Sequence, residues 1–283
     1  MMMRLMGAAV AALCLALPAA AQTGSPDAAL LARGRHLVEV TGACGNCHTP
    51  MGPQGPDMTR ALAGGNVFDE PPFRAVASNI TQDPETGIGR WTDAQIGRAI
   101  REGIRPDGRI IGPPMPIGLY RGLSDRDLAA MVAYLRTVAP VRNAVEASVY
   151  RIPLPPAYGP PVATVPDPAD NPVARGAYLA NAVAHCMECH TPMVDGRNDF
   201  SRIGAGGMEF RGPWGVSVAR NLTPHANGIG GWTDAEIIRA ITTGVSQNGR
   251  PLAPPMAFWA YRSMTPQELS DLVSYLRSLP PQP

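Results

Sequence analysis

Apolar residues recur at intervals of three and four along several segments of the chain, which is the spacing of helices with one buried face. The pattern appears over 27–41 and again in two stretches that begin after Ser124 and Thr265. Convincing runs of alternating apolar and polar residues, typical of half-buried strands, are not found. The pattern therefore predicts an all-α fold of short helices. The apolar residues expected on the buried faces of these helices are Leu30, Leu31, Leu37, Val38, Leu128, Val132, Leu135, Leu269, Leu272, Val273 and Leu276.

Four helix starts are marked by capping residues. Thr92-Asp93-Ala94-Gln95 and Thr233-Asp234-Ala235-Glu236 have the composition of capping boxes, in which a Thr hydroxyl and a side chain three residues later satisfy free backbone N–H groups. Ser124 and Thr265 are expected to cap the last helix of each half. Pro266 then occupies the first helical position, where its missing N–H costs nothing.

The sequence repeats itself at an offset of 142 and then 141 residues. The segments 87–103 and 228–244 are identical at 12 of 17 positions. This similarity predicts a tandem pair of domains of roughly 110 residues, an ordinary domain size. We expect a first unit at 27–139 and a second unit at 173–281. Further matched elements are Gly64-Gly65 with Gly206-Gly207, Asn79-Ile80-Thr81 with Asn221-Leu222-Thr223, Pro113-Pro114-Met115 with Pro254-Pro255-Met256, and Tyr134-Leu135-Arg136 with Tyr275-Leu276-Arg277.

The segment 140–172 between the units holds nine prolines in 33 residues. Proline-rich chain is stiff and extended rather than floppy. We expect this linker to run across both units and to restrict their relative orientation.

Residues 1–21 are expected to be a signal peptide. Arg4 provides a short basic region, 7–17 is apolar, and Ala19-Ala20-Ala21 forms a small-residue cleavage site. The apolar run is shorter than the ~20 residues that a membrane span needs. Cys14 lies within it, preceded by Leu13 rather than a small residue, so lipidation is not expected. We therefore expect a periplasmic protein, soluble or peripherally membrane-associated.

Composition excludes several function classes. All 24 basic residues are Arg and none is Lys, which excludes Schiff-base and Walker-type lysine chemistry. The net charge of +1 gives no support to nucleic-acid binding. A hydrophobic fraction of 45% is enough to form a core and excludes wholesale disorder.

The four cysteines beyond Cys14 indicate the chemistry. Cys44 and Cys47 precede His48, and Cys186 and Cys189 precede His190, so that each half carries one Cys-x-x-Cys-His motif. This spacing is typical of c-type haem attachment, in which two thiols bond to the haem and the adjacent His is the proximal iron ligand. Disulfides, a thioredoxin-type dithiol or a zinc site would leave the repeated His unexplained. We expect two covalently attached haems.

The sixth iron ligand is predicted to be Met115 in the first unit and Met256 in the second. They follow His48 and His190 by 67 and 66 residues, which is enough chain to reach the opposite haem face. The preceding proline pairs would stiffen the loop that presents the thioether. The repeated Met51 and Met193 come only three residues after the proximal His and are too close to reach round. The remaining histidines, His36, His185 and His225, have no counterpart in the other repeat, and the alternative for Met115 and Met256 is a packing role.

Two other repeated residue types are candidates for contact with the haem. Trp91 and Trp232 could donate an indole N–H to a haem propionate, although buried tryptophans are more often core residues. Asn79 and Asn221 open Asn-x-Thr sequences. Their recurrence favours a structural turn or a contact at the haem edge over glycosylation.

Together these motifs resemble class I cytochrome c domains, and more narrowly the multihaem cytochrome c subunits of bacterial alcohol, gluconate and aldehyde dehydrogenases. The resemblance covers about 30–281 and implies His48 with Met115 and His190 with Met256 as axial ligands. The alcohol and gluconate subunits have three such domains, whereas this chain has two. Two-haem subunits of this kind also accompany molybdenum hydroxylases.

The sequence favours an electron-transfer protein over an enzyme. The function expected is a periplasmic dihaem cytochrome c that relays electrons from a flavin, quinoprotein or molybdenum dehydrogenase to the respiratory chain, where a cytochrome, an oxidase or a quinone accepts them. The alternative is a dihaem redox enzyme, peroxidase-like or thiosulfate-oxidising. Such an enzyme would need an open or unusual distal site at one haem, and both repeats carry the same Pro-Pro-Met sequence.

Overall fold

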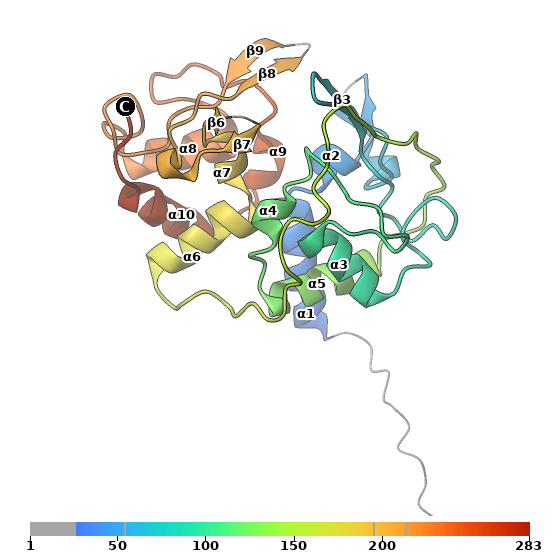
Figure 1. Cartoon of the computed structure of the whole chain (residues 1–283). Helices are drawn as coiled ribbons and strands as arrows, with labels where there is room; N and C mark the ends of the chain where they lie inside the picture. Colours follow the sequence, from blue (N-terminus) through green and yellow to red (C-terminus); the bar gives the residue numbers. More distant parts are fainter. Residues whose placement is uncertain (1–26, 54, 195, 213) are drawn as a thin grey trace, which may run out of the picture.

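The computed structural model describes residues 27–53, 55–194, 196–212 and 214–283, and the expected signal peptide lies outside them. The two repeats form two halves that lie side by side (Figure 1). No helix among the described residues is long and apolar enough to cross a bilayer.

Each unit contains the same five α-helices in the same order. The first helix continues into a π-helical turn, η1 (Leu37–Thr41) in the first unit and η3 (Leu179–Val183) in the second. The helices of the first unit are α1 (Ala28–His36), α2 (Gly45–His48), α3 (Asp93–Glu102), α4 (Ile117–Tyr120) and α5 (Asp125–Leu135). Those of the second unit are α6 (Pro172–Tyr178), α7 (Cys186–Cys189), α8 (Asp234–Thr243), α9 (Phe258–Tyr261) and α10 (Pro266–Ser278).

The caps expected from the sequence are confirmed. Thr92, Thr233 and Thr265 open α3, α8 and α10 with reciprocal capping boxes, and Pro266 occupies the first turn of α10. Ser124 caps α5 by accepting a hydrogen bond from the Asp127 N–H. These helices begin where the sequence predicted because their caps depend only on residues three positions apart.

The expectation of an all-α fold is only partly right, because the mainly helical structure also contains short antiparallel sheets. Strands of two to four residues are too short to show an alternating pattern. The first unit holds β1 (Met51–Gly52) paired with β2 (Gly55–Pro56), and β3 (Val67–Glu70) paired with β4 (Phe73–Val76), which also pairs with β5 (Val149–Tyr150) of the linker. The second holds β6 (Met193–Val194) paired with β7 (Arg197–Asn198), and β8 (Glu209–Gly212) paired with β9 (Gly215–Val218). Each unit also has one 3₁₀ turn between its two hairpins, η2 (Met58–Arg60) in the first unit and η4 (Phe200–Arg202) in the second.

The first and last helices of each unit cross at a glycine. A Cβ at Gly34 of α1 would lie 1.9 Å from the Ala130 carbonyl oxygen of α5, and a Cβ at Gly176 of α6 would lie 1.9 Å from that of Asp271 in α10. Only glycine allows the backbones to come this close. On the apolar faces predicted for α5 and α10, Leu135 and Leu276 are buried.

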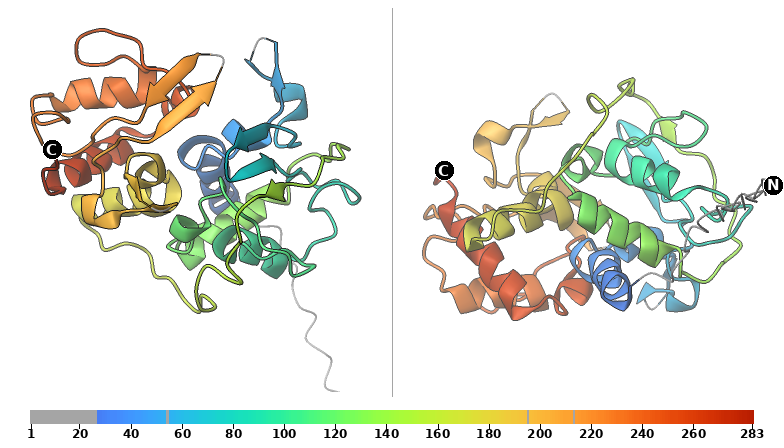
Figure 2. Two further views of the ribbon diagram at one scale, coloured as in Figure 1. Left: turned by 45° about the horizontal axis from the view of Figure 1, so that its top comes forward. Right: turned by 90° about the horizontal axis from the view of Figure 1, so that it is seen from below.

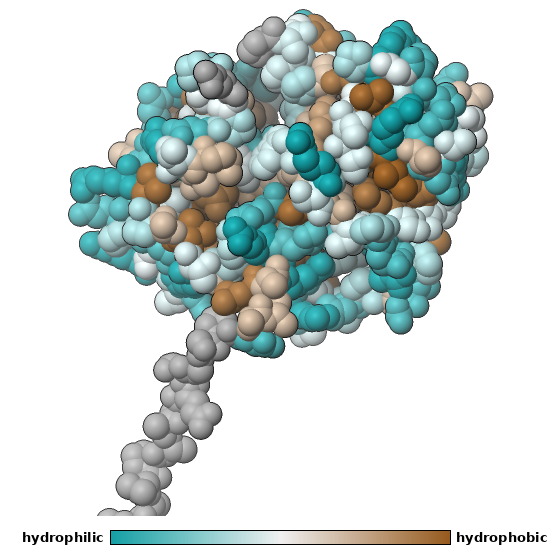
Figure 3. Space-filling view, turned by 180° about the vertical axis from the view of Figure 1, so that it is seen from behind, coloured by the Kyte–Doolittle hydropathy of each residue, from teal (hydrophilic) through white to brown (hydrophobic). Residues whose placement is uncertain are grey.

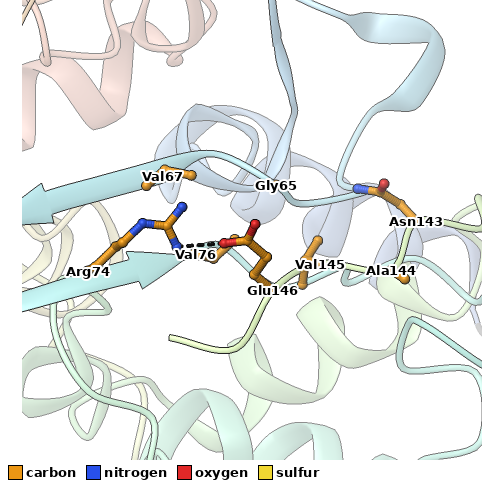
Figure 4. A pocket seen from close by; sticks show the side chains of 8 residues that line it. All are labelled: Gly65, Val67, Arg74, Val76, Asn143, Ala144, Val145 and Glu146. Atoms are coloured by element: carbon orange, nitrogen blue, oxygen red, sulfur yellow. Dashed lines mark hydrogen bonds and ion pairs between the residues drawn. The ribbon is translucent and has the colours of Figure 1, made fainter. Parts of the chain in front are cut away.

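The linker packs along the first unit rather than across both. Val141 and Asn143 bond to Asn79 and Ala63, and further on the Val165 carbonyl accepts from the Asp125 N–H. A shallow pocket between the linker and the β3–β4 hairpin is bridged by a 2.7 Å ion pair from Arg74 to Glu146 (Figure 4). The linker is therefore part of the surface of the first unit.

The units instead contact each other directly through equivalent elements. Helix α4 packs against η3, α9 packs against η1, and η1 contacts η3. Figure 2 shows the α1–α5 pair beside the α6–α10 pair in the view from below. Side chains also bond across this contact, among them His36 to Glu268 and Asn46 to the Pro255 carbonyl.

Candidate haem sites

The two thiols of each motif are placed by a single helical turn. Cys44 caps α2 and Cys47 lies within it, while Cys186 and Cys189 begin and end α7. Residues three apart lie on the same side of a helix, so both thiols of each pair face one way. All four are free cysteines. Burial raises the pKa of Cys44, Cys47 and Cys186 to about 12, and that of Cys189 also rises through burial, which keeps the thiols neutral.

The imidazole rings are held by backbone carbonyls. The Nδ1–H of His48 donates to the carbonyl oxygen of Ser78 at 2.7 Å, and that of His190 donates to Arg220 at 2.7 Å. Burial lowers the pKa of both rings, which favours the neutral form. A neutral imidazole with its proton on Nδ1 presents Nε2 as a lone-pair donor, which is the form that binds iron.

A glycine lets the segment carrying each of these carbonyls approach the motif. Gly64 has a positive φ of 74°, and a Cβ there would lie 2.5 Å from the Ala77 carbonyl oxygen. Its N–H donates to the His48 carbonyl at 2.7 Å, so one residue joins the motif to the segment that carries Ser78. Gly206 bonds in the same way to His190. The repeated Gly-Gly pair thus orients the proximal histidine.

Carboxamides hold the end of each motif. Asn66 Nδ2 donates to the Cys47 and Thr49 carbonyls at 2.9 and 2.7 Å. In the second unit Asn198 donates to the Glu188 and Thr191 carbonyls at 2.7 and 3.2 Å. The two asparagines are not equivalent in sequence, so the repeat gave no sign of their shared role.

The repeated Asn-x-Thr element is a structural turn. Asn79 is only 2% exposed, and its Oδ1 accepts from the N–H and hydroxyl of Thr81 at 3.0 and 2.7 Å. Asn221 makes the same bonds to Thr223 at 2.8 and 2.7 Å. Of the two roles expected for this element, a structural turn or a contact at the haem edge, the structure shows the turn.

The two pairs of repeated methionines have different surroundings. Met51 and Met193 are 61% and 54% exposed on β1 and β6. Met115 and Met256 are partly buried and pack against the same core as Cys44 and Cys186. Each follows a cis peptide bond between its two prolines and precedes a short helix, α4 or α9. The structure thus places Met115 and Met256, and not Met51 and Met193, against the core that surrounds the thiols.

The tryptophans also pack against this core. The guanidinium carbon of Arg105 lies 5.3 Å from the centroid of the Trp91 ring. The backbone carbonyl of Trp91 accepts a hydrogen bond from Arg136, and that of Trp232 accepts one from Arg277. Their role as propionate donors stays a prediction.

The three remaining histidines are engaged elsewhere. His36 Nε2 lies 2.8 Å from Glu268, His185 Nδ1 lies 3.2 Å from Glu188, and His225 Nδ1 accepts from the Asn227 N–H at 3.1 Å. Among the described residues no group of three or more His, Cys, Asp or Glu could hold a metal ion by itself. The donor set, two neutral thiols beside one oriented imidazole, instead fits a haem that brings its own iron.

Comparison with known proteins agrees with this donor set. The family model described as cytochrome c matches residues 31–139 and again 173–280. The chain belongs to the cytochrome c family. Membership implies covalently bound c-type haem, with one family match over each Cys-x-x-Cys-His motif.

Several curated relatives of this cytochrome are components of dehydrogenases. It is 34% identical to a subunit of the nicotinate dehydrogenase of Pseudomonas putida, over 98% of this chain and 24% of the relative. It is 30% identical to the cytochrome c subunit of the quinone alcohol dehydrogenase of Gluconacetobacter polyoxogenes, over 95% of this chain and 60% of the relative. A diheme cytochrome c-type protein of Cereibacter sphaeroides is 31% identical over 72% of this chain and 70% of the relative. The cytochrome thus spans about a quarter of the first relative and three fifths of the second.

Two buried tyrosines of the cytochrome beside the cysteines were not predicted. Tyr120 and Tyr261 are 4% and 7% exposed. Burial, together with the nearby Cys44 or Cys186 thiol, raises the pKa of each phenol well above 10, so both stay neutral. The signal was present in the sequence, because both tyrosines follow the Pro-Pro-Met element at the 141-residue offset.

Proposed function

We propose that this cytochrome carries two haems and transfers electrons as a subunit or partner of a dehydrogenase. The observation that carries the proposal is the duplicated geometry of the motifs. In both units, two neutral thiols stand beside an imidazole whose Nδ1 is fixed by a carbonyl at 2.7 Å. Haem iron, when bound there, accepts and releases single electrons.

We assign the residue roles within this proposal. Cys44, Cys47, Cys186 and Cys189 would form the thioether bonds, His48 and His190 would be the proximal ligands, and Met115 and Met256 would be the distal ones. Trp91 and Trp232 donate to propionates. Because a His/Met pair saturates the iron and raises its potential, neither site is left open to a substrate. This supports electron transfer over the peroxidase-like or thiosulfate-oxidising alternative.

The partner that we propose as electron donor is a dehydrogenase. Relatives are named as cytochrome subunits of alcohol, fructose and gluconate dehydrogenases and as a nicotinate dehydrogenase subunit. Quinoprotein, flavin or molybdenum enzymes could each supply electrons, and a cytochrome, oxidase or quinone of the respiratory chain would accept them. The leader-like segment 1–21 supports a periplasmic site for this relay.

The number of haems and their state can be tested together. Expression with the haem-attachment machinery should give an intact mass equal to the chain from Gln22 plus two haems. Both ferric haems should be low-spin by electron paramagnetic resonance. The catalytic-enzyme alternative predicts a high-spin signal from one haem, and a mass with one haem or none would contradict the proposal.

A further inference from the structure

The haem motif of the first unit bonds to the distal loop of the second. Asn46, which lies between Cys44 and Cys47, donates from Nδ2 to the Pro255 carbonyl oxygen at 3.1 Å. Its Oδ1 accepts from the indole Nε1 of Trp259 at 3.3 Å. Pro255 directly precedes Met256, and Trp259 lies in α9 just after it. Both ends of one carboxamide therefore bind the segment that carries the proposed ligand.

The packing around this carboxamide is close. The Trp259 ring lies against Gly45, where an added Cβ would be 3.4 Å from the ring. Helix α9 also contacts η1, the turn that leads into the first motif. In Figure 1 α2 and α9 face each other at the boundary between the two halves. The loop of the second unit is thus braced on the first unit.

The reverse bond does not form among the described residues. Glu188 is the counterpart of Asn46, and Gly118 is the counterpart of Trp259. A carboxylate has no N–H to donate to the Pro114 carbonyl, and a glycine has no indole. Glu188 instead pairs with His185 of its own unit at 3.2 Å. The bracing therefore acts in one direction, from the first motif to the second distal loop.

We propose that Asn46 is a positioning residue that keeps the Met256 loop closed over the second haem. This inference rests on the proposed ligation by Met256. A bond to the carbonyl before the ligand resists the loop movement that a competing ligand needs. Since a hydrogen bond contributes about 0.5–1.5 kcal/mol net, its loss should change ligand competition by roughly two- to tenfold.

Imidazole is a suitable probe because it must displace the methionine to bind ferric iron. In the dihaem protein, Asn46→Asp keeps the acceptor for Trp259, removes the donor and places a carboxylate oxygen against the Pro255 carbonyl. We expect imidazole to bind the second haem roughly two- to tenfold more tightly, with the first haem unchanged. Asn46→Ser, whose side chain is too short to reach Pro255, should shift binding in the same direction and serves if the Asp variant does not mature.

Three further variants complete the design. Met115→Ala and Met256→Ala assign each imidazole binding curve to a haem. Asn171→Asp is the matched control, because the same exchange at this exposed position keeps an oxygen that accepts from the Ala174 N–H, and it should leave both curves unchanged. Circular dichroism confirms that each variant keeps the native fold.

The outcomes separate this inference from the proposed function. If Met256→Ala leaves imidazole binding unchanged, the ligation by Met256 is wrong. If Met256→Ala changes binding but neither Asn46 variant does, only the positioning role is wrong. A response confined to the first haem, to whose motif Asn46 belongs, would also overturn the positioning role.

Discussion

At the residue scale, the site combines side chains that the sequence reveals with backbone groups that it does not. Motif spacing alone indicated the cysteines and proximal histidines. The number of residues between the proximal histidine and each methionine favoured Met115 and Met256 over Met51 and Met193, which are exposed. The carbonyls that orient the histidines belong to Ser78 and Arg220, two residues with unrelated side chains. Any residue provides a backbone carbonyl, so the residue type does not identify these acceptors. In this sequence only the repeated glycines indicated where they lie.

The distal ligands are testable one haem at a time. Thioether ligation stabilises ferrous over ferric iron, so Met115→His or Met256→His should lower the reduction potential of one haem and leave the other near its original value. Spectroelectrochemical titration measures both potentials. Each substitution should also remove about half of the sulfur-to-iron charge-transfer band. Met51→His and Met193→His, at the exposed pair, are the controls. If these substitutions lowered the potentials and the other two did not, Met51 and Met193 would be the distal ligands.

At the scale of elements, helices were easier to predict than strands. The capping boxes at Thr92, Thr233 and Thr265 mark helix starts through bonds between residues three apart. The hairpins have strands of two to four residues, and their pairing depends on the turn and on partners such as the linker strand β5. Such strands are stabilised by tertiary packing, and they are too short to show a periodic pattern from which they could be predicted.

The cap of α10 should contribute measurably to stability. The Thr265 hydroxyl accepts from the Glu268 N–H at 3.2 Å, and Glu268 bonds back to the Thr265 N–H at 2.9 Å. Thr265→Ala should lower the free energy of unfolding by about 0.5–2 kcal/mol, measured by urea denaturation of the haem-loaded protein. Ser270→Ala, at an exposed position of the same helix, should change the free energy of unfolding little. Equal effects of the two substitutions would contradict the role of the cap.

At the scale of the whole molecule, the two units meet through reciprocal contacts of equivalent elements. His36 of the first unit lies 2.8 Å from Glu268, the third residue of α10. Its counterpart Tyr178 donates to Asp127, the third residue of α5, at 2.9 Å. The partners are equivalent in position but differ in chemistry, a histidine–glutamate pair on one side and a tyrosine–aspartate pair on the other. Comparison of the repeats could therefore reveal the duplication but not the interface, because neither contact resembles the other in sequence.

The contact at Glu268 should make stability depend on pH. Burial acts to raise the pKa of Glu268, but the hydrogen bonds from His36 and from the Thr265 N–H outweigh it and hold the pKa below the ordinary 4.5. A lowered pKa in the folded state stabilises the protein above pH ~4.5, and this contribution is lost as the pH falls through the folded value. Glu268→Gln should thus destabilise the protein at pH 6 and much less at pH 3.5 in urea titrations. Glu70→Gln, at an exposed position of β3, is the control. A Glu268→Gln effect that is the same at both pH values would contradict this linkage.

The charge of the whole molecule bears on how it meets its partners. The 24 basic and 23 acidic residues nearly balance, and many arginines pair with carboxylates of the same chain, as Arg74 does with Glu146 and Arg151 with Asp69. Apolar residues are exposed next to both motifs, Met51 after the first and Met193 after the second. On the face of the molecule that Figure 3 shows, hydrophobic residues are interspersed with hydrophilic ones.

Such a molecule has only a weak overall field with which to steer a partner. We therefore expect mainly apolar docking around each haem edge, rimmed by Arg, and only a weak dependence of electron transfer on ionic strength. Stopped-flow reduction by the cognate dehydrogenase across a salt series measures this dependence. Steered association responds steeply to salt, because charges separated by more than ~8 Å are screened at physiological ionic strength. A rate that fell by orders of magnitude between low and physiological salt would therefore show that charge, and not the apolar surface beside the motifs, governs the encounter.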